Sequence, residues 1–198
     1  MTVLVLASAS AARARLLEAC GVAAIIDPAA VDEARIKTEQ RARGAAAEQC
    51  ALLLAEMKAR AVAPAHAGAL VLGADQMLEC GDAWVDKPRT LDEARDQLRA
   101  LNGRQHALVT AAAVVRDERV LWRHVERARV TLRRFSEAFL DLYLRAMGRR
   151  VLSSVGGYEL EGLGAQLMAR IEGDYFAILG LPLLPLLECL RVEGALAQ

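Results

Sequence analysis

The stretch from Ala69 to Pro88, ALVLGADQMLECGDAWVDKP, constrains the fold and the chemistry of this chain more than any other. Residues 69–72 form a short apolar run that is typical of a buried strand. Gly73 and Ala74 add almost no side-chain bulk, and Asp75 follows at once. A carboxylate at the end of a buried strand is costly unless another group pairs with it or uses it. The stretch therefore predicts a strand that ends in a paired or functional acid.

The second half of this stretch predicts a hairpin. Residues 80–82 (CGD) are a turn signal, and the chain then returns through 84–88. Such a hairpin would bring Lys87 near Asp75. Two interpretations follow: an ion pair that closes the hairpin, or a fixed acid and a fixed cation that together hold a phosphate ester and its metal.

The composition indicates a folded chain without a global electric field. A length of 198 residues suits one domain, with room for two lobes, and 55% apolar residues exclude a disordered chain. The 25 basic and 25 acidic residues cancel, so no net charge draws the protein to nucleic acid or to an anionic membrane. An acidic substrate would have to be held by local groups.

The cysteines and the N-terminus favour the reducing cytoplasm. The four cysteines form no C-x-x-C pair and the three histidines lack ligand spacing, which argues against a zinc site or a disulfide framework. Residues 2–6 are apolar but short and lack a basic leading segment, so a strand is expected there and not a signal peptide. No apolar run is long enough to span a membrane.

The N-terminal region predicts an anion site. A strand at 3–6, a small-residue loop at 7–10 and a helix at 11–20 follow one another, with Ser10 as the helix N-cap. Free backbone N–H groups point outward at such a helix start. Arg13 lies in the first turn, where the helix dipole disfavours a cation unless an anion is bound. The alternative is that Arg13 is simply solvated.

Three further groups have an ordinary and a functional interpretation. The adjacent acids of 31–33 (VDE) could serve a divalent cation, although the residues alone favour contact with water. Lys58, on an alanine-rich helix at 45–63, would usually be a solvated charge. The arginines near Arg129 suit the exposed face of an edge strand; nucleic-acid binding is the other interpretation, but aromatic residues are few there.

The rest of the chain alternates strands and helices, which argues for an α/β fold. Helices are expected after the capping box at 90–93, from Ser136 to Met147 and from 183 to 192. Strands are expected at 106–115 and 120–135, with a hairpin formed by 166–171 and 175–179. The glycine-rich segment 155–164 matches neither the dinucleotide fingerprint nor the Walker A loop.

Taken together, these motifs resemble the Maf family. The opening LASASAARARLLEACGV resembles the family's signature, in which a small serine-rich loop precedes an arginine-bearing helix. Further blocks follow in the family's order over nearly the whole chain: 31–33, 54–59, 73–75, 87–88, Gly103 with His106 and Thr110, 156–158, 161–162 and 180–182.

The resemblance implies a nucleoside triphosphate pyrophosphatase, an enzyme that cuts between the α- and β-phosphates to give a nucleoside monophosphate and pyrophosphate. It implies one α/β domain over residues 1–198, with a mixed, elongated central sheet and two lobes around a deep cleft, as in inosine triphosphate pyrophosphatase. It also implies a homodimer, a divalent metal (Mg²⁺, with Mn²⁺ as an alternative), removal of non-canonical nucleotides and an association with septum formation.

Residue by residue, the resemblance gives Asp75 the part of general base, since a carboxylate can orient a water molecule. Lys58 and Lys87 match the two lysines that hold the triphosphate and offset the charge of the leaving pyrophosphate. Glu33 matches a family acid that helps with the metal. The N-terminal phosphate loop corresponds to Ser8, Ser10 and Arg13.

The chain departs from the family pattern at positions that bear on specificity. Ala11-Ala12 replaces the usual Pro-Arg, and Ser154 replaces a common lysine. Gln76 and Glu161 resemble the branch that acts on 7-methyl-GTP more than the pyrimidine branch, which prefers Thr or Val and Gln at these positions. A carboxylate at 161 could accept hydrogen bonds from the guanine edge and would suit a cationic base. The 7-methyl-GTP branch, however, often has tryptophan where Ala12 stands, so a stacking platform is missing.

Two rival functions follow from the same residues. One is a regulator of cell division that binds a nucleotide without turning it over; the presence of Asp75 argues against it, since binding alone needs no positioned base. The other is a nucleic-acid-binding module built on the arginines near Arg129, which the balanced charge opposes.

Overall fold

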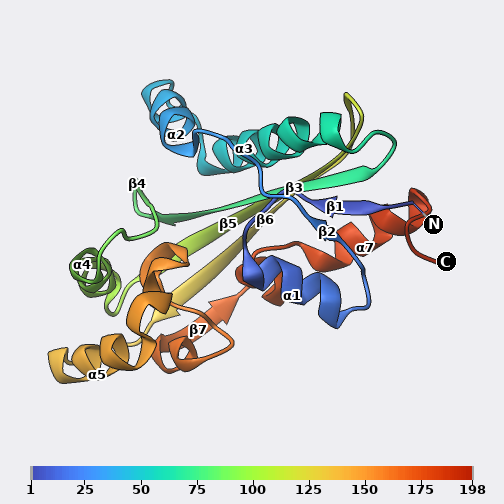
Figure 1. The fold of residues 1–198 in the computed structure, drawn as a ribbon. Helices are drawn as coiled ribbons and strands as arrows, with labels where there is room; N and C mark the ends of the chain where they lie inside the picture. The colour runs from blue at the N-terminus through green and yellow to red at the C-terminus, as the bar shows by residue number, and fades with distance from the viewer. Residues whose placement is uncertain (1, 198) are drawn as a thin grey trace. The chain divides into compact units, whose positions relative to one another are not determined.

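A computed structural model describes residues 2–197 and shows a mixed seven-stranded sheet with strand order β2-β1-β3-β5-β6-β7, with β4 paired to β3 (Figure 1). Strand β1 runs parallel to both β2 and β3, whereas β4 is antiparallel to β3 and β7 is antiparallel to β6. The expected α/β fold with a mixed sheet is confirmed. The strands are β1 (Leu4–Leu6), β2 (Ile25–Ile26), β3 (Leu70–Cys80), β4 (Ala83–Val85), β5 (Gln105–Arg116), β6 (Arg119–Leu132) and β7 (Met168–Glu172).

The helices begin where capping side chains predict. Ser10, Thr90 and Ser136 each accept a hydrogen bond from a backbone N–H of the first turn that they precede. The α-helices are α1 (Ala11–Ala19), α2 (Glu33–Ala42), α3 (Ala47–Val62), α4 (Leu91–Leu101), α5 (Glu137–Met147), α6 (Tyr175–Leu179) and α7 (Leu183–Val192). Short 3₁₀ turns are η1 (Ala63–Ala65), η2 (Gly148–Leu152), η3 (Val155–Gly157) and η4 (Leu163–Leu167).

The chain divides into two compact units. The first consists of Met1–Gln76, Thr110–Glu126 and Asp174–Gln198, and the second of Met77–Val109 and Arg127–Gly173. The long strands β3, β5 and β6 each contribute residues to both units. A single domain over 1–198 with a deep cleft stays a prediction.

The first unit is built around β1 and β3, whose side chains alternate between two buried faces. One face, with Leu4, Leu6 and Leu72, packs against residues of α1 and α7. The other face, with Val5 and Val71, packs against residues of α3. Figure 1 shows α3 on one side of these strands and α1 on the other. Helices thus cover both faces, which explains why the strands are continuous apolar runs.

Helix α3 lies unusually close to β3 because residue 73 is glycine. A Cβ built on Gly73 would overlap the carbonyl oxygen of Ala55 and would lie 2.7 Å from the backbone nitrogen of Ala59. Both are backbone atoms of α3, so they cannot move without the whole helix. Gly73 is therefore the point at which helix and strand backbones approach one another.

Substituting Gly73 with alanine should push α3 away from β3. We expect Gly73→Ala to lower the free energy of unfolding by about 1–3 kcal/mol, the usual cost of overpacking a tight interior, as measured by urea denaturation. Gly162→Ala is the matched control: a Cβ there would meet only the flexible end of Arg150, at 3.8 Å. Equal stability of the two variants would contradict the close approach.

In the second unit, α4 contacts α5 and the turns η2 and η3. Its buried residues Leu98 and Leu101 lie on one face, as the sequence predicts. His106 on β5 is 3% exposed, and its Nε2 lies 2.6 Å from the hydroxyl of Tyr158. Burial lowers the pKa of His106 to about 4, so its ring is neutral near pH 7.

Four expectations are corrected. Asp75 does not end its strand, because β3 continues to Cys80. Residues 175–179 form helix α6, capped by Asp174, and not the second strand of a hairpin. Strand β6 is not an edge at Arg129, since β7 pairs with it from Arg129 to Leu132. Helix α2 was not expected at all; only Ile36 of its residues is buried, so its sequence shows little apolar periodicity.

Candidate active site

Three charged side chains meet in the first unit. The Nζ of Lys58 on α3 lies 2.6 Å from Oδ1 of Asp75 on β3 and 2.7 Å from Oε1 of Glu33 at the start of α2. Lys58 and Asp75 are almost wholly buried, with side chains 9% and 6% exposed, whereas Glu33 is 44% exposed. The structure thus brings together three of the predicted site residues. The expectation that Lys58 is merely solvated is wrong.

Asp75 has one oxygen engaged and one available. Its Oδ1 accepts from Lys58, but its Oδ2 is buried and has no hydrogen-bond partner among the described residues. A buried carboxylate oxygen without a partner is costly, and such atoms in folded proteins call for an explanation. A bound water, cation or substrate proton would supply the missing partner.

Local structure accounts for the meeting of these groups. Gly73 lets α3 approach β3, and Lys58 lies one position before Ala59, one of the two α3 residues that lie against Gly73. Asp32 caps α2 by accepting from the N–H of Arg35, which fixes Glu33 as the first residue of the helix. The adjacent acids of this segment therefore have separate tasks: one caps the helix and the other contacts Lys58.

The N-terminal loop forms the predicted strand–loop–helix arrangement. Ser10 caps α1, its side chain accepting from the N–H of Arg13 at 3.4 Å. The backbone N–H of Ser10 in turn donates to Oγ of Ser8 at 3.2 Å. Ser8 is buried, at 8% exposed. The loop is thus ordered by its own hydroxyl groups.

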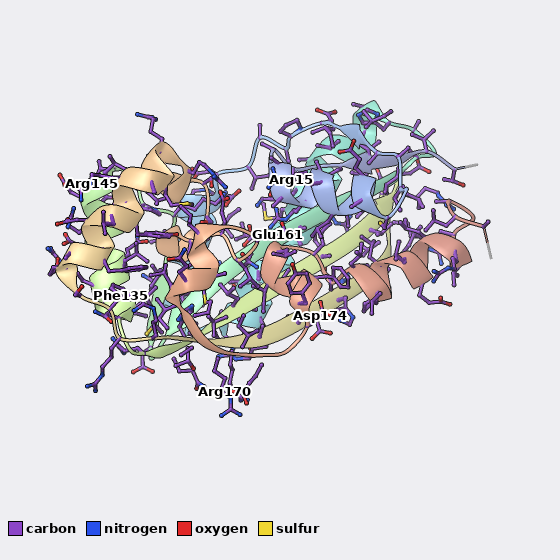
Figure 2. All side chains as sticks on the ribbon, turned by 90° about the horizontal axis from the view of Figure 1, so that it is seen from below. Arg15, Phe135, Arg145, Glu161, Arg170 and Asp174 are labelled. Atoms are coloured by element: carbon purple, nitrogen blue, oxygen red, sulfur yellow. The ribbon has the colours of Figure 1, made fainter. Side chains whose placement is uncertain are left out.

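Arg13 is not solvated but buried, at 8% exposed. Its Nε donates to the carbonyl of Gly180 at 2.9 Å, and its Nη1 donates to Oγ of Ser8 at 3.0 Å and to the carbonyl of Ala74 at 2.9 Å. Burial lowers the pKa of Arg13, while the carboxylates of Asp75 and Glu33 act in the opposite direction. Arg15, by contrast, is exposed on α1 (Figure 2).

Gln76, next to Asp75, is held by its amide nitrogen. Nε2 donates to Oγ1 of Thr110 and to the carbonyl of Ala177 at 2.9 Å, and to the carbonyl of Ile178 at 3.1 Å. The hydroxyl of Thr110 also donates to Ala177, at 2.8 Å. The sequence pointed to Gln76 but gave Thr110 no role; a fully buried hydroxyl in an apolar strand is the signal that could have identified it.

Lys87 and Glu161 belong to the second unit. Lys87 is exposed and follows β4, whose pairing with β3 runs from Cys80–Ala83 to Leu78–Val85. The hairpin is confirmed, but the proximity of Lys87 to Asp75 stays a prediction. Glu161 is exposed in the loop labelled in Figure 2.

The segment just before Glu161 is firmly anchored within its own unit. Oγ of Ser154 donates to the carbonyl of Tyr158 at 2.7 Å, and the hydroxyl of Tyr143 donates to the carbonyl of Gly157 at 3.1 Å. With the contact between Tyr158 and His106, these bonds fix the backbone from 154 to 158. The family resemblance carried His106 and Tyr158, and the structure shows that they contact one another.

Two arginines near Arg129, Arg127 in β6 and Arg133 just after it, are engaged in local contacts. Arg127 pairs with Glu79, and Arg133 donates to the carbonyl of Gln166 at 2.6 Å and lies over the ring of Phe139 at 4.2 Å. These contacts use the cations within the protein and weaken the case for a nucleic-acid surface.

Across residues 2–197, no group of three or more His, Cys, Asp or Glu side chains is arranged to hold a metal, and no helix is long and apolar enough to cross a membrane.

Comparison with known proteins gives consistent matches over the whole length. A family model described as Maf-like protein matches residues 3–193. The nucleoside triphosphate pyrophosphatase of Paramagnetospirillum magneticum is 52% identical over 191 residues, covering 96% of this chain and 98% of that protein. The enzyme of the same name from Granulibacter bethesdensis is 49% identical over 98% of each chain. The 7-methyl-GTP pyrophosphatase of Rhizobium meliloti is 48% identical over 98% of this chain and 97% of that protein.

Proposed function

We propose, from the premise that this chain belongs to the Maf family, that it is a hydrolase that acts as a nucleoside triphosphate pyrophosphatase. It would cleave between the α- and β-phosphates and release a nucleoside monophosphate and pyrophosphate, removing non-canonical nucleotides. The observation that carries the proposal is Asp75: a buried carboxylate with one oxygen fixed by Lys58 and the other without a partner.

Asp75 is suited to the part of general base. The bond from Lys58 to Oδ1 fixes the orientation of the carboxylate, which leaves Oδ2 to accept a proton from water. As that proton moves to Oδ2, the water oxygen forms a bond to phosphorus. The bond between the α-phosphorus and the bridging oxygen breaks, and pyrophosphate leaves with the electron pair.

The cations and the loop would bind the phosphates. Lys58 is already next to the base, and its charge offsets the negative charge that develops on the leaving group. Lys87 would act in the same way on the far phosphates. Ser8, Ser10 and the N-terminus of α1 would donate hydrogen bonds to phosphate oxygens.

A divalent cation fits the chemistry of this donor set. Mg²⁺ is commonly held by one or two carboxylates together with substrate phosphates. The carboxylate of Glu33, half-exposed beside Lys58, is an oxygen donor of that kind. Mg²⁺, or Mn²⁺ in its place, would supply charge neutralisation on the phosphates. Glu33 is the residue that we propose to hold it.

A 7-methyl-GTP pyrophosphatase is the second candidate. A relative named 7-methyl-GTP pyrophosphatase is 48% identical to this chain, and one named nucleoside triphosphate pyrophosphatase is 49% identical. The two names are therefore found at about the same level of similarity. Gln76 and Glu161 support it. An exposed carboxylate at 161 can accept from the guanine edge and suits a base that carries a positive charge.

We also propose that the protein works as a homodimer in the cytoplasm. Its four cysteines are free, three of them buried, which suits a reducing compartment. The family resemblance supports the dimer.

The deciding experiment measures pyrophosphate release from UTP, dTTP, CTP, GTP and 7-methyl-GTP. We expect release from at least one nucleotide with Mg²⁺ or Mn²⁺ and none after chelation with EDTA, with activity restored by adding the cation back. Preference for 7-methyl-GTP would establish the narrower function. Nucleotide binding without release from any substrate would overturn the enzyme and favour the non-catalytic regulator of septum formation.

A further inference from the structure

The hydrogen bonds around Ser8 fix the direction of its hydroxyl proton. Oγ of Ser8 accepts from the backbone N–H of Ser10 at 3.2 Å and from Nη1 of Arg13 at 3.0 Å. A hydroxyl oxygen has two lone pairs, so both are occupied. The O–H can then only donate, and it has no acceptor among the described residues. Such a hydroxyl is prepared to bind an anion.

Arg13 differs from Ser8, because most of its N–H donors already bind acceptors within the protein. Both hydrogens of Nη1 are taken, by Ser8 and by the carbonyl of Ala74, and Nε is bound to the carbonyl of Gly180. The guanidinium of Arg13 therefore contacts three segments that are far apart in the sequence: the 7–10 loop, the residue before Asp75 and the end of α6. Only Nη2 has no protein acceptor among these residues.

We propose that Arg13 is a positioning residue that turns the Ser8 hydroxyl into a phosphate donor. The proposal rests on the proposed function for the identity of the ligand. It gives Arg13 a specific part in the N-terminal phosphate loop that the family resemblance implies. Burial lowers the pKa of Arg13 overall, while the nearby carboxylates of Asp75 and Glu33 favour its charged form.

A double-mutant cycle tests whether Arg13 acts through Ser8. The variants are Ser8→Ala, Arg13→Lys and the double variant. Lysine keeps the charge but lacks the fork that reaches three acceptors, so it separates charge from geometry. Arg13→Met is a harsher variant that leaves two buried carbonyls without donors and could fail to fold; Arg13→Lys keeps the test usable in that case. Arg15→Lys, at an exposed arginine of the same helix, is the matched control.

The first measurement is the affinity for inorganic tripolyphosphate, by titration calorimetry on variants whose circular dichroism matches the unmodified protein. Ser8→Ala and Arg13→Lys should each weaken binding about tenfold, the order expected for one hydrogen bond to a charged group, and the double variant should also lose only about tenfold. A loss of about a hundredfold in the double variant would show independent contacts and overturn the proposal. Unchanged binding in Ser8→Ala would overturn it as well.

The second measurement separates this proposal from the proposed function. With a hydrolysed nucleotide, the same variants should raise KM about tenfold and leave kcat within about threefold, because a phosphate contact made equally in the bound and transition states affects binding alone. A large fall in kcat with unchanged KM would contradict the positioning role. If the unmodified protein releases no pyrophosphate, the proposed function fails, while the tripolyphosphate cycle still decides the role of Arg13.

Discussion

Replacing Asp75 with asparagine is expected to reduce pyrophosphate release by about a thousandfold, within the range that a general base contributes. The amide keeps an oxygen that can accept from Lys58, so the packing of α3 on β3 should survive. It cannot take a proton from water, however. Nucleotide affinity, measured by calorimetry, should stay within a few-fold of the unmodified protein.

The control for this experiment is Asp82→Asn, at an exposed acid in the turn that follows the same strand. It removes one carboxylate without touching the buried pair and should leave turnover unchanged. Turnover near that of the unmodified protein in Asp75→Asn would exclude Asp75 as the base and would require another group to activate the water.

Replacing Lys58 with methionine should have the second large effect, and on two properties at once. Asp75 would remain buried without its cation, and breaking a buried pair by removing one partner costs about 3–5 kcal/mol. Turnover should also fall by at least about a hundredfold, since a preorganised charge at the phosphates is lost. Urea denaturation and pyrophosphate release measure the two effects.

Two further variants test whether the effects depend on the geometry of Lys58 and on its burial. Lys58→Arg keeps the charge and should restore much of the stability, but less of the turnover, because the wider guanidinium does not fit between two carboxylates in the same way. Arg43→Met, at an exposed arginine just after helix α2, should change neither property appreciably. If Lys58→Met is as stable as Arg43→Met, the pair with Asp75 is not buried in solution.

The sequence showed that Asp75 needed a partner. Local spacing pointed to Lys87, across a short hairpin, and that proximity stays a prediction. The partner that the structure shows is Lys58 on α3. That pairing depends on how closely α3 packs on β3, which Gly73 determines. Gly73 was noticed as a small residue, but its contact with α3 is tertiary and leaves no periodic signal.

Arg13 illustrates the same limit. The helix dipole disfavours an arginine in the first turn of α1, and we expected a bound phosphate to resolve that conflict. The structure resolves it with two carbonyl groups and one hydroxyl from distant segments. Helices α4 and α7 were predicted nearly to the residue, because the capping box of α4 and the proline before α7 are local signals.

The position of Asp75 within β3 has a consequence for motion during turnover. Because β3 lies between β1 and β5 in the sheet, its backbone opens only when the sheet itself does, on the slow timescale of core unfolding. Glu33 lies instead at the start of a helix in which only Ile36 is buried, so that this end of α2 can move with less loss of packing. Movement of Glu33 on ligand binding should therefore cost less than movement of Asp75.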